Sequence, residues 1–306
     1  MKTIYITIVD YHGKENTIEC LESLEKMDTQ DIALHVVIIN NAEQGDISIE
    51  KKYKNFSIHI FNPHTNLGFS GGHNMGIEYS LKSGADAVLI LNNDTIVHSN
   101  LIKELIVPLD HDKNVGIVSP KIYFAKGYEF HKDRYKEDEL GKVFWYAGGI
   151  MDWKNVIGHH RGVDEVDMGQ YNTVESTDFA SGCCLLVTRE VFERVGIFNE
   201  LYFLYYEDTD LSERVKRAGF IIQYIPQALL WHKNAASAGG SGSQLQDYFI
   251  TRNRLLFGMK YAPVRSKIAL LKESITILGK GREWQKKGVK DFYERKFGKG
   301  SFVTSE

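Results

Sequence analysis

The stretch Ala85–Thr95, ADAVLILNNDT, joins a short apolar run to a polar end. The run, Ala87–Leu91, has the length of a strand buried in a parallel sheet and is too short for a typical helix. It stops at Asn92, Asn93 and Asp94, and ligands of open α/β sheets bind just beyond the carboxyl ends of the strands. A carboxylate there can bind a divalent cation together with the phosphates of a ligand. The alternative is a simple Asn-Asp turn, since both residue types favour turns.

The rest of the chain alternates strands and helices in the way that builds a parallel sheet with covering helices. Strands are predicted at residues 3–9, 35–39, 57–61 and 87–91, with helices at 16–27, from the loop 66–76 to about 81, and at 99–109. Short strands and loops folded over the sheet are predicted at 127–177, then a strand entered through 180–187, a helix after 204–211 that ends near 218–219, and strands at 219–225 and 228–231. The pattern therefore predicts an α/β fold.

The loop 66–76, NLGFSGGHNMG, is rich in glycine and leads into a predicted helix. It matches neither the phosphate loop GxxxxGK[ST] nor the dinucleotide motif GxGxxG, so neither mechanism follows from it. Its glycines would still allow the backbone to approach a ligand closely.

The composition is that of an ordinary globular protein, with 306 residues of which 43% are hydrophobic and 25% charged. The three cysteines are odd in number and lack metal-ligand spacing, which favours a reducing compartment over a disulfide framework. The first apolar run, Ile4–Val9, is too short for a secretory signal, and we expect no membrane-spanning helix because no apolar run reaches about 18 residues. These features predict a cytoplasmic protein.

The net charge of −3 hides a basic region near the carboxyl end. Residues 251–300 hold 14 Lys and Arg against 4 Asp and Glu, which indicates an anionic partner or a solvated helix face. After Pro263, which breaks the preceding helix, one apolar stripe is formed by Val264, Ile268, Leu271, Ile275 and Leu278. This stripe fits core packing or a dimer seam somewhat better than peripheral contact with the inner face of the cell membrane.

Three polar features far apart in sequence each lie at the end of a predicted element, as active-site residues of α/β proteins do. They are Asp94, the cluster Glu207–Asp210 (EDTD) and His232. Metal-assisted transfer to a hydroxyl needs a cation on the leaving diphosphate and a carboxylate base for the attacking oxygen. Within the cluster, Asp210 fits an N-terminal helix cap, and a single histidine is often structural.

The chain resembles the inverting family 2 glycosyltransferases with a GT-A fold, and most closely the bacterial rhamnosyltransferase-like members. The similarity extends from Ile4 to about Tyr261. It rests on IVDYHGKENTIECLESL, VIINNA, NLGFSGGHNMGI, LILNNDT, SGCCLLVTREVFERVGIFNE, YFLYYEDTDLSERVKRAG, the WH at 231–232 and YFITRNRLLF, which occur in this order.

The resemblance implies roles for individual residues. Asp94, at the end of a DXD-like motif, is the expected ligand of Mg²⁺ or Mn²⁺, and His232 is the expected second ligand. The ED motif places the catalytic base on Asp208, with Glu207 beside it. The residues expected to bind the donor are Val9, Asp10, Asn41, Asn66, Gly68, Gly72 and Asn74 around the nucleoside, Asn92 and Asn93 near the sugar, and Arg252 and Asn253 near the diphosphate.

The resemblance also implies the fold and the reaction. Residues 1–262 would form a Rossmann-like GT-A domain with a mostly parallel central sheet, and residues 263–306 a basic helical extension. The implied function is transfer of a sugar, first of all L-rhamnose from dTDP-β-L-rhamnose, to a saccharide or lipid-linked saccharide in bacterial surface polysaccharide synthesis. No nucleic-acid partner is implied.

Alternatives remain for the donor and the activity. Asn40 stands where aspartate often contacts the nucleobase, and Asp10 where Asn is frequent, so a UDP-hexose donor stays open. A sugar-1-phosphate nucleotidyltransferase would need a Gly- and Arg-rich loop after the first strand, and DYHGKENT is not one. An inactive saccharide-binding scaffold subunit is the non-enzyme alternative, which loss of Asp94 or Asp208 would favour.

Overall fold

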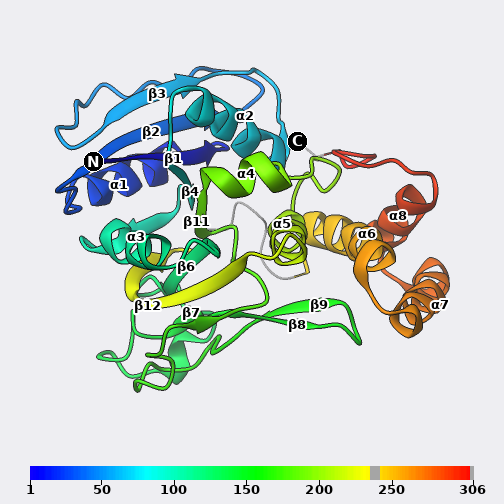
Figure 1. Cartoon of the computed structure of the whole chain (residues 1–306). Coiled ribbons are helices and arrows are strands. Elements are labelled where there is room, and N and C mark those ends of the chain that lie inside the picture. The colour runs from blue at the N-terminus through cyan, green and yellow to red at the C-terminus, as the bar shows by residue number, and fades with distance from the viewer. Residues whose placement is uncertain (235–241, 304–306) are drawn as a thin grey trace.

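The structure is a computed structural model, and the residues that it describes are 1–234 and 242–303. Within these residues a mostly parallel sheet carries helices on both faces (Figure 1). The sheet strands are β1 (Lys2–Asp10), β2 (Ile32–Asn40), β3 (Ser57–Phe61), β4 (Ala87–Asn92), β5 (Thr95–Val97), β6 (Val115–Phe124), β7 (Phe144–Tyr146), β10 (Glu175–Ser176), β11 (Cys184–Thr188) and β12 (Ile221–His232), and a separate hairpin contains β8 (Gly149–Asp152) and β9 (Ile157–His160). The α-helices are α1 (Lys14–Leu24), α2 (Gly68–Lys82), α3 (Leu101–His111), α4 (Arg189–Val195), α5 (Glu207–Arg217), α6 (Gln244–Tyr261), α7 (Val264–Lys280) and α8 (Glu283–Tyr293).

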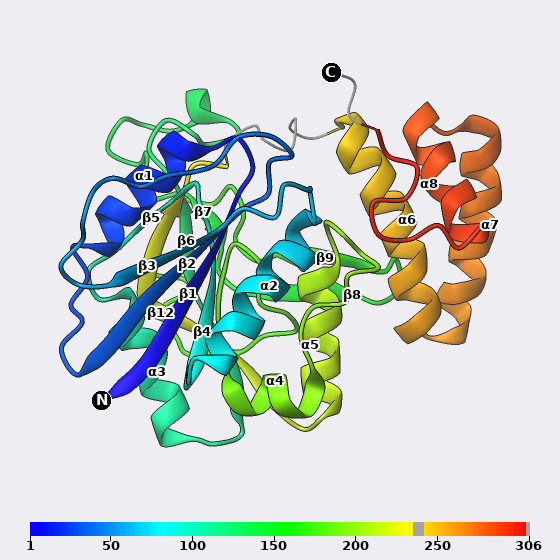
Figure 2. The ribbon, with the colours of Figure 1, turned by 90° about the horizontal axis from the view of Figure 1, so that it is seen from above.

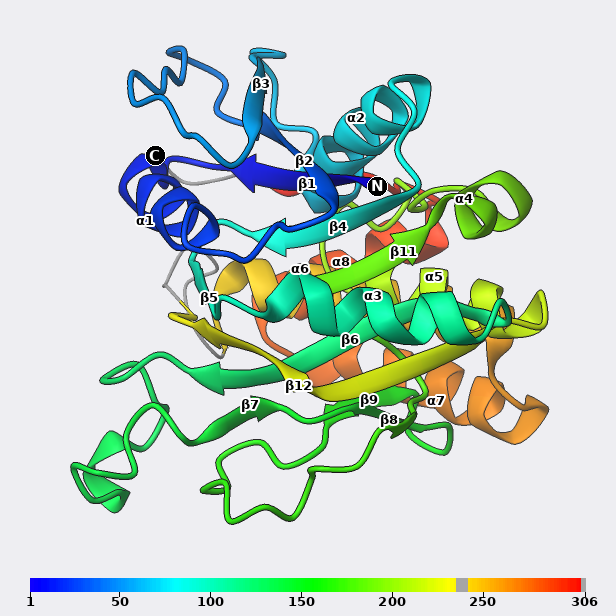
Figure 3. The ribbon, with the colours of Figure 1, turned by 60° about the vertical axis from the view of Figure 1, so that its left-hand side comes forward.

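The strand order is β10-β12-β6-β11-β4-β1-β2-β3, with β5 beside β12 and β7 beside β6. The order from β12 to β3 can be followed in Figure 3. Strand β1 pairs in parallel with β2 and β4, and β6 pairs in parallel with β12. Strand β11 lies antiparallel between β4 and β6. The carboxyl ends of β1, β2, β4, β6 and β12 therefore meet at one edge of the sheet, as the predicted α/β fold requires.

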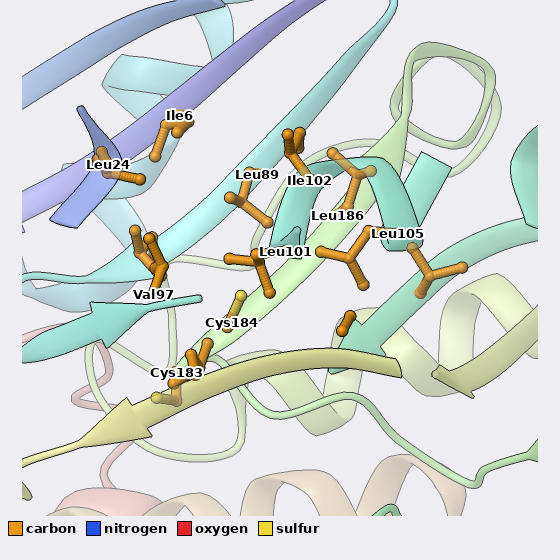
Figure 4. Close-up of a cluster of buried hydrophobic side chains, with 14 of the residues drawn as sticks. Ile6, Leu24, Leu89, Val97, Leu101, Ile102, Leu105, Cys183, Cys184 and Leu186 are labelled. Carbon is orange, nitrogen blue, oxygen red and sulfur yellow. The ribbon is translucent and has the colours of Figure 1, made fainter. Parts of the chain in front are cut away.

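Strands β1 and β4 are buried on both faces, which explains why their sequences are continuous apolar runs. On one face Ile6 and Leu89 pack with apolar side chains of α1 and α3, such as Leu101 (Figure 4). On the other face Val88 and Ile90 belong to a second cluster with residues of α2, α4 and α5. Each fully buried side chain of this kind stabilises the fold by about 1.5–3 kcal/mol.

The glycine-rich segment forms the first turns of α2 instead of the predicted loop. A Cβ added at Gly72 would lie 2.8 Å from Cγ2 of Val9, and one at Gly76 would lie 2.8 Å from Cγ2 of Thr7. These glycines let α2 lie directly against β1. The close contact with Val9 explains why residue 72 is glycine, and its expected approach to a ligand stays a prediction.

Strand β6 and helix α4 are not indicated by the sequence patterns, and β12 is one strand where two are predicted. Strand β6 is buried along its whole length even though it contains Pro120 and Lys121, which disguise its apolar pattern. Strand β12 shifts register against β6 between Ile225 and Leu229, around Pro226. Proline cannot donate to a strand ladder, so the predicted break marks an irregularity inside a single strand.

Helices α6, α7 and α8 pack together beside the sheet domain (Figure 2). Asp247 of α6 forms an ion pair with Arg282 just before α8, and the Tyr248 ring packs edge-on against Trp284 with centroids 6.1 Å apart. The division of the chain at residues 262 and 263 falls between α6 and α7 and stays a prediction. No helix among the described residues is both long enough and apolar enough to cross a membrane.

The apolar stripe of α7 does not contribute to the core of this chain, which corrects the core-packing interpretation. Val264 is 72% exposed, Ile268 49% and Ile275 67%. The residues of α7 that face inward are instead Leu270 and two serines, Ser266 and Ser274. The stripe is thus an outward face with basic side chains on the same helix.

Candidate functional site

The ends of β4 and β12 bring two of the predicted site residues together. Asp94 follows β4, and His232 is the last residue of β12, where it pairs with Thr95 of β5. The Nε2 atom of His232 lies 3.1 Å from Oδ1 of Asp94, and both residues are buried. The Trp145 ring packs edge-on against His232 with centroids 4.6 Å apart, which fixes the orientation of the imidazole. The sequence analysis did not single out this tryptophan.

This pair has the donor atoms and spacing of two ligands of one divalent ion. Two atoms that each lie about 2.1–2.2 Å from an ion and subtend a right angle are about 3 Å apart, close to the observed separation. No group of three or more His, Cys, Asp or Glu side chains within residues 1–234 and 242–303 could hold a metal. The remaining positions would therefore fall to a diphosphate and water, as is common for Mg²⁺ and Mn²⁺ sites. Asp94 and His232 fit such an ion.

The residues at the end of β1 form a tight network with those that follow β4. Asp10 accepts hydrogen bonds from the Gly13 amide (3.1 Å) and from the Thr17 hydroxyl. The Nδ2 atom of Asn93 donates to the same hydroxyl at 3.1 Å. Val9 is the register neighbour of Asn92, and both are half-buried. Asp10 and Asn93 thus shape the edge, while Val9 and Asn92 keep surface that a ligand can contact.

The predicted nucleoside residues near α2 divide into two groups. Asn41 accepts a hydrogen bond from the Leu67 amide at 3.0 Å and donates to the Gly68 carbonyl at 2.9 Å, beside the half-buried Asn66. Asn74, by contrast, donates to the Phe198 carbonyl and accepts from the Phe198 amide, both at 3.0 Å. The prediction that Asn74 contacts the donor is therefore wrong, because its amide is buried and joins α2 to the chain before α5.

Gly68 has a structural reason to be glycine. Its φ angle is +71°, which side chains with a Cβ rarely adopt, and an added Cβ would come 2.5 Å from the Phe203 carbonyl oxygen. The Phe69 amide donates to the same carbonyl at 2.8 Å. Gly68 thus fixes the start of α2 against the segment that precedes α5.

Glu207 and Asp208 are the first two residues of α5. Asp208 is half-buried, and its Oδ2 atom accepts a hydrogen bond from the Gly182 amide at 2.9 Å. Its Oδ1 atom accepts from the Thr209 amide at 2.6 Å. Glu207 is buried, and its Oε2 atom has no hydrogen-bond partner in the described part of the chain. Burial raises the pKa of Asp208, and burial together with the Asp208 charge raises the pKa of Glu207 well above its ordinary value.

A single turn before β11 connects the cation pair to these carboxylates. On one side of the turn, the Cys183 carbonyl accepts a hydrogen bond from the Asn92 amide at 2.9 Å. On the other side, the amide of the preceding residue, Gly182, donates to Asp208. A Cβ at Gly182 would lie 2.9 Å from the Phe69 ring, so the turn has no room for a side chain there. The sequence predicts a small-residue turn here but does not reveal that it joins the two halves of the site.

Asp210 is not the helix cap that the sequence indicates. Tyr206, in a left-handed conformation, precedes α5, and no side chain caps the helix. Asp210 is fully buried and accepts from Arg214 Nε at 2.7 Å, Lys260 Nζ at 3.0 Å and Tyr261 Oη at 2.8 Å. It joins α5 to the end of α6 and has no accessible oxygen for catalysis.

Arg252 and Asn253 do not lie where a donor diphosphate could reach them, which corrects that prediction. Both side chains are fully buried in α6. The Nδ2 atom of Asn253 donates to the carbonyls of Tyr202, Leu204 and Tyr205 at 2.8–2.9 Å. Arg252 Nη2 donates to the Tyr202 carbonyl at 3.0 Å. Asn253 Nδ2 and Arg252 Nη2 thus face the segment that leads into Glu207, while Arg252 Nη1 donates to Tyr248 and to the Lys296 carbonyl.

Comparison with known proteins shows the family of the chain. The family described as "Glycosyltransferase like family 2" matches residues 2–258. The chain is 26% identical over 252 residues to the low-salt glycan biosynthesis hexosyltransferase Agl10 of Haloferax volcanii, covering 82% of this chain and 74% of that protein. It is 25% identical over 231 residues to the dTDP-rhamnosyl transferase RfbF of Shigella flexneri, covering 75% of this chain and 68% of that protein.

Among solved structures, GalNAc-T7 with UDP, GalNAc and Mn²⁺ superposes with a TM-score of 0.56 at 13% identity. The match covers 89% of this chain and 54% of that one, so this chain spans about half of that protein. At this identity the likeness shows the fold, and it confirms the predicted GT-A architecture. Because the family model matches residues 2–258, most of the chain, the chain belongs to glycosyltransferase family 2.

Proposed function

We propose that this protein is an inverting glycosyltransferase that moves L-rhamnose from dTDP-β-L-rhamnose to a hydroxyl of a saccharide or lipid-linked saccharide. The observation that carries the proposal is the shared turn, in which Cys183 contacts the strand end before Asp94 and Gly182 contacts Asp208. A candidate cation site and a carboxylate on two sides of one short turn are the parts that a single displacement needs.

In the proposed reaction, Asp94 and His232 act on the leaving diphosphate and Asp208 acts on the acceptor hydroxyl. Asp94 and His232 would hold Mg²⁺ or Mn²⁺ with the donor diphosphate, and the bound ion would stabilise the charge that develops on that diphosphate. Asp208 takes the proton of the acceptor hydroxyl as its oxygen bonds to the anomeric carbon and the bond from that carbon to the diphosphate breaks. Because the acceptor attacks directly, the anomeric configuration inverts.

The donor would lie along the carboxyl ends of β1, β2 and β4. Val9, Asn66 and Asn92 are half-buried there and leave surface for a nucleotide sugar. The relative named a dTDP-rhamnosyl transferase supports the rhamnose donor, while the structure that contains UDP and GalNAc supports the alternative of a UDP-hexose. The second alternative, an inactive scaffold, is disfavoured because both Asp94 and Asp208 are present at the site.

The donor is tested by slow hydrolysis of nucleotide sugars, which needs no acceptor. The purified protein with Mn²⁺ is incubated with dTDP-β-L-rhamnose, UDP-glucose, UDP-N-acetylglucosamine and GDP-mannose, and the released nucleotide is measured. We expect dTDP-β-L-rhamnose to react fastest and EDTA to stop the reaction. Faster turnover of a UDP-hexose would show that the donor is a UDP-hexose and would leave the proposed reaction unchanged. If none of the donors reacts in a metal-dependent way, the result supports the scaffold alternative.

We also propose that residues 263–306 form an extension that contacts the anionic inner surface of the cell membrane. Four residues of the stripe are exposed on α7, Val264, Ile268, Ile275 and Leu278, and Leu271 is half-buried. Arg265 and Lys272 are exposed on the same helix. An apolar stripe flanked by basic side chains suits a helix that lies in the interface of an anionic bilayer. This charge complementarity favours lipid over the dimer seam as the partner of the stripe.

Vesicle binding tests the membrane contact. Replacing Ile268 and Ile275 by serine removes apolar area without changing charge, so we expect binding to vesicles with anionic lipid to weaken about tenfold or more. Val107→Ser, at a valine that is 49% exposed on α3, is the matched control and should bind normally. A double variant that binds unchanged but converts from dimer to monomer in sedimentation would show that the stripe is a dimer seam.

A further inference from the structure

The segment that leads into Glu207 has an unusual backbone. Phe203, Tyr205 and Tyr206 have φ angles of +64°, +67° and +72°, in the left-handed region that residues with a Cβ disfavour. Three such residues within four positions directly precede the two carboxylates of the ED motif. Strain of this kind persists only where the surroundings hold the backbone in place, and it gathers at functional sites.

The surroundings here are two adjacent side chains of α6. The amide of Asn253 donates to the carbonyls of Tyr202, Leu204 and Tyr205, so one side chain holds the segment at three points. Arg252 donates from Nε to the Asn253 side-chain oxygen at 3.0 Å, which orients that amide. Neither side chain is exposed to solvent.

The same segment also reaches the other side of the site. The Phe203 carbonyl accepts from the amides of Phe69 and Ser70, at 2.8 and 3.2 Å, at the start of α2. Phe203, with its φ angle of +64°, thus contacts α2 through its carbonyl while the chain continues to Glu207. A change in the segment would therefore shift the start of α5, which carries the base, relative to the loop where the nucleoside is expected.

We propose that Arg252 and Asn253 are positioning residues for the catalytic carboxylates. They hold the left-handed segment Phe203–Tyr206, and this segment sets where α5 begins and how Asp208 meets the Gly182 amide. Neither residue touches the donor. The inference rests on the proposed function in that Asp208 is taken as the base.

The test is Asn253→Ala, which removes the Asn253 donor from the carbonyls of Leu204 and Tyr205 and leaves the Tyr202 carbonyl with its Arg252 donor, but keeps the helix. We expect kcat to fall about 10²-fold, the usual effect of a misplaced catalytic group, while the KM for the donor and the Mn²⁺ requirement stay the same. The acid limb of the kcat profile should move to lower pH, because a displaced Asp208 is less buried and burial is the largest cause of its raised pKa. A loss of folded protein alone would lower the active fraction without moving this limb.

Two further variants separate positioning from general stability. Arg254→Ala, at the next residue of α6, removes an ion pair with Glu273 and hydrogen bonds to Asn155, and should leave kcat and the acid limb unchanged. Tyr205→Gly places a residue that tolerates positive φ in the segment, and should restore part of kcat in the Asn253→Ala background. If Asn253→Ala does not fold, Asn253→Ser, which retains one donor, takes its place.

The outcomes are distinguishable from those that test the reaction itself. Wild-type kcat in Asn253→Ala, or a lower kcat with an unmoved acid limb and no rescue by Tyr205→Gly, overturns the positioning role. If Asp208→Asn is as active as the wild type, the proposed base is wrong and the positioning role falls with it. A loss in Asp208→Asn together with full activity in Asn253→Ala rejects the positioning role alone.

Discussion

Asp208→Asn is expected to lower kcat by about 10²–10⁴-fold, the usual share of general base catalysis. The substitution keeps the shape of the side chain and an oxygen that can accept from the Gly182 amide, but it removes the group that takes the acceptor proton. Donor and metal binding should be nearly unchanged, because Asp94 and His232 lie on the other side of the turn. Turnover with acceptor, measured beside donor binding by calorimetry, checks both parts.

The pH profile gives the same experiment a second readout. Burial raises the pKa of Asp208, and a base must be deprotonated to act, so activity should fall as the pH drops through a value above about 3.9, the ordinary aspartate pKa. The residual activity of Asp208→Asn should lack this acid limb. Glu207→Gln is the comparison: if it abolishes turnover while Asp208→Asn stays active, the base is Glu207. Full activity in both variants contradicts single displacement through this motif.

Asp94→Asn is expected to lower kcat/KM by about 10³-fold or more and to abolish its dependence on Mn²⁺. A bound ion contributes several kcal/mol of charge stabilisation to a leaving diphosphate, and the amide is a far weaker ligand than the carboxylate. The substitution would remove the charged neighbour of the His232 imidazole but would not move the strand. Titration of activity with Mn²⁺ measures the effect directly.

Asp86→Asn provides the matched control for this variant. Asp86 lies just before the first residue of β4, at the end of the strand away from Asp94. It accepts a hydrogen bond from the Thr3 amide at 2.8 Å. The same chemical change there should leave the Mn²⁺ titration unchanged. His232→Gln should weaken Mn²⁺ activation as well, though less than Asp94→Asn, because it removes a neutral ligand. An unaltered Mn²⁺ dependence in Asp94→Asn would show that the ion binds elsewhere.

The sequence predicts well the features that depend on local pattern. The runs in β1 and β4 are apolar because both faces of these strands are buried, and this periodicity is visible without a structure. Asp94 and His232 follow such runs, so their meeting at one edge of the sheet could be anticipated from the parallel topology. The turn at residues 180–184 is also visible as a cluster of small residues.

The features that depend on distant contacts could not be predicted from pattern. Asp210 looks like a cap because it opens a helix, but Lys260 and Tyr261, about fifty positions away, engage it. The family resemblance places Arg252 and Asn253 near the diphosphate, yet they bind carbonyls of residues 201–205. Local spacing does not show which backbone carbonyls lie opposite a buried side chain, so these roles require the fold.

The role of the α7 stripe also could not be predicted from the sequence pattern. A period of three and four residues indicates an apolar face but not what covers it. In this chain the inward positions are taken by Leu270 and two serines, so the stripe faces outward. Amphipathic spacing alone does not distinguish a core helix from an exposed interaction surface.

A crystal structure of Asp208→Asn with Mn²⁺ and dTDP-β-L-rhamnose tests the central claim most directly. The account predicts that Oδ1 of Asp94 and Nε2 of His232 each lie within roughly 2.0–2.3 Å of the ion, with the diphosphate completing its coordination. It also predicts that the side chain of residue 208 faces the anomeric carbon from the side opposite the diphosphate. An ion bound without contact to His232, or an anomeric carbon turned away from residue 208, would contradict it.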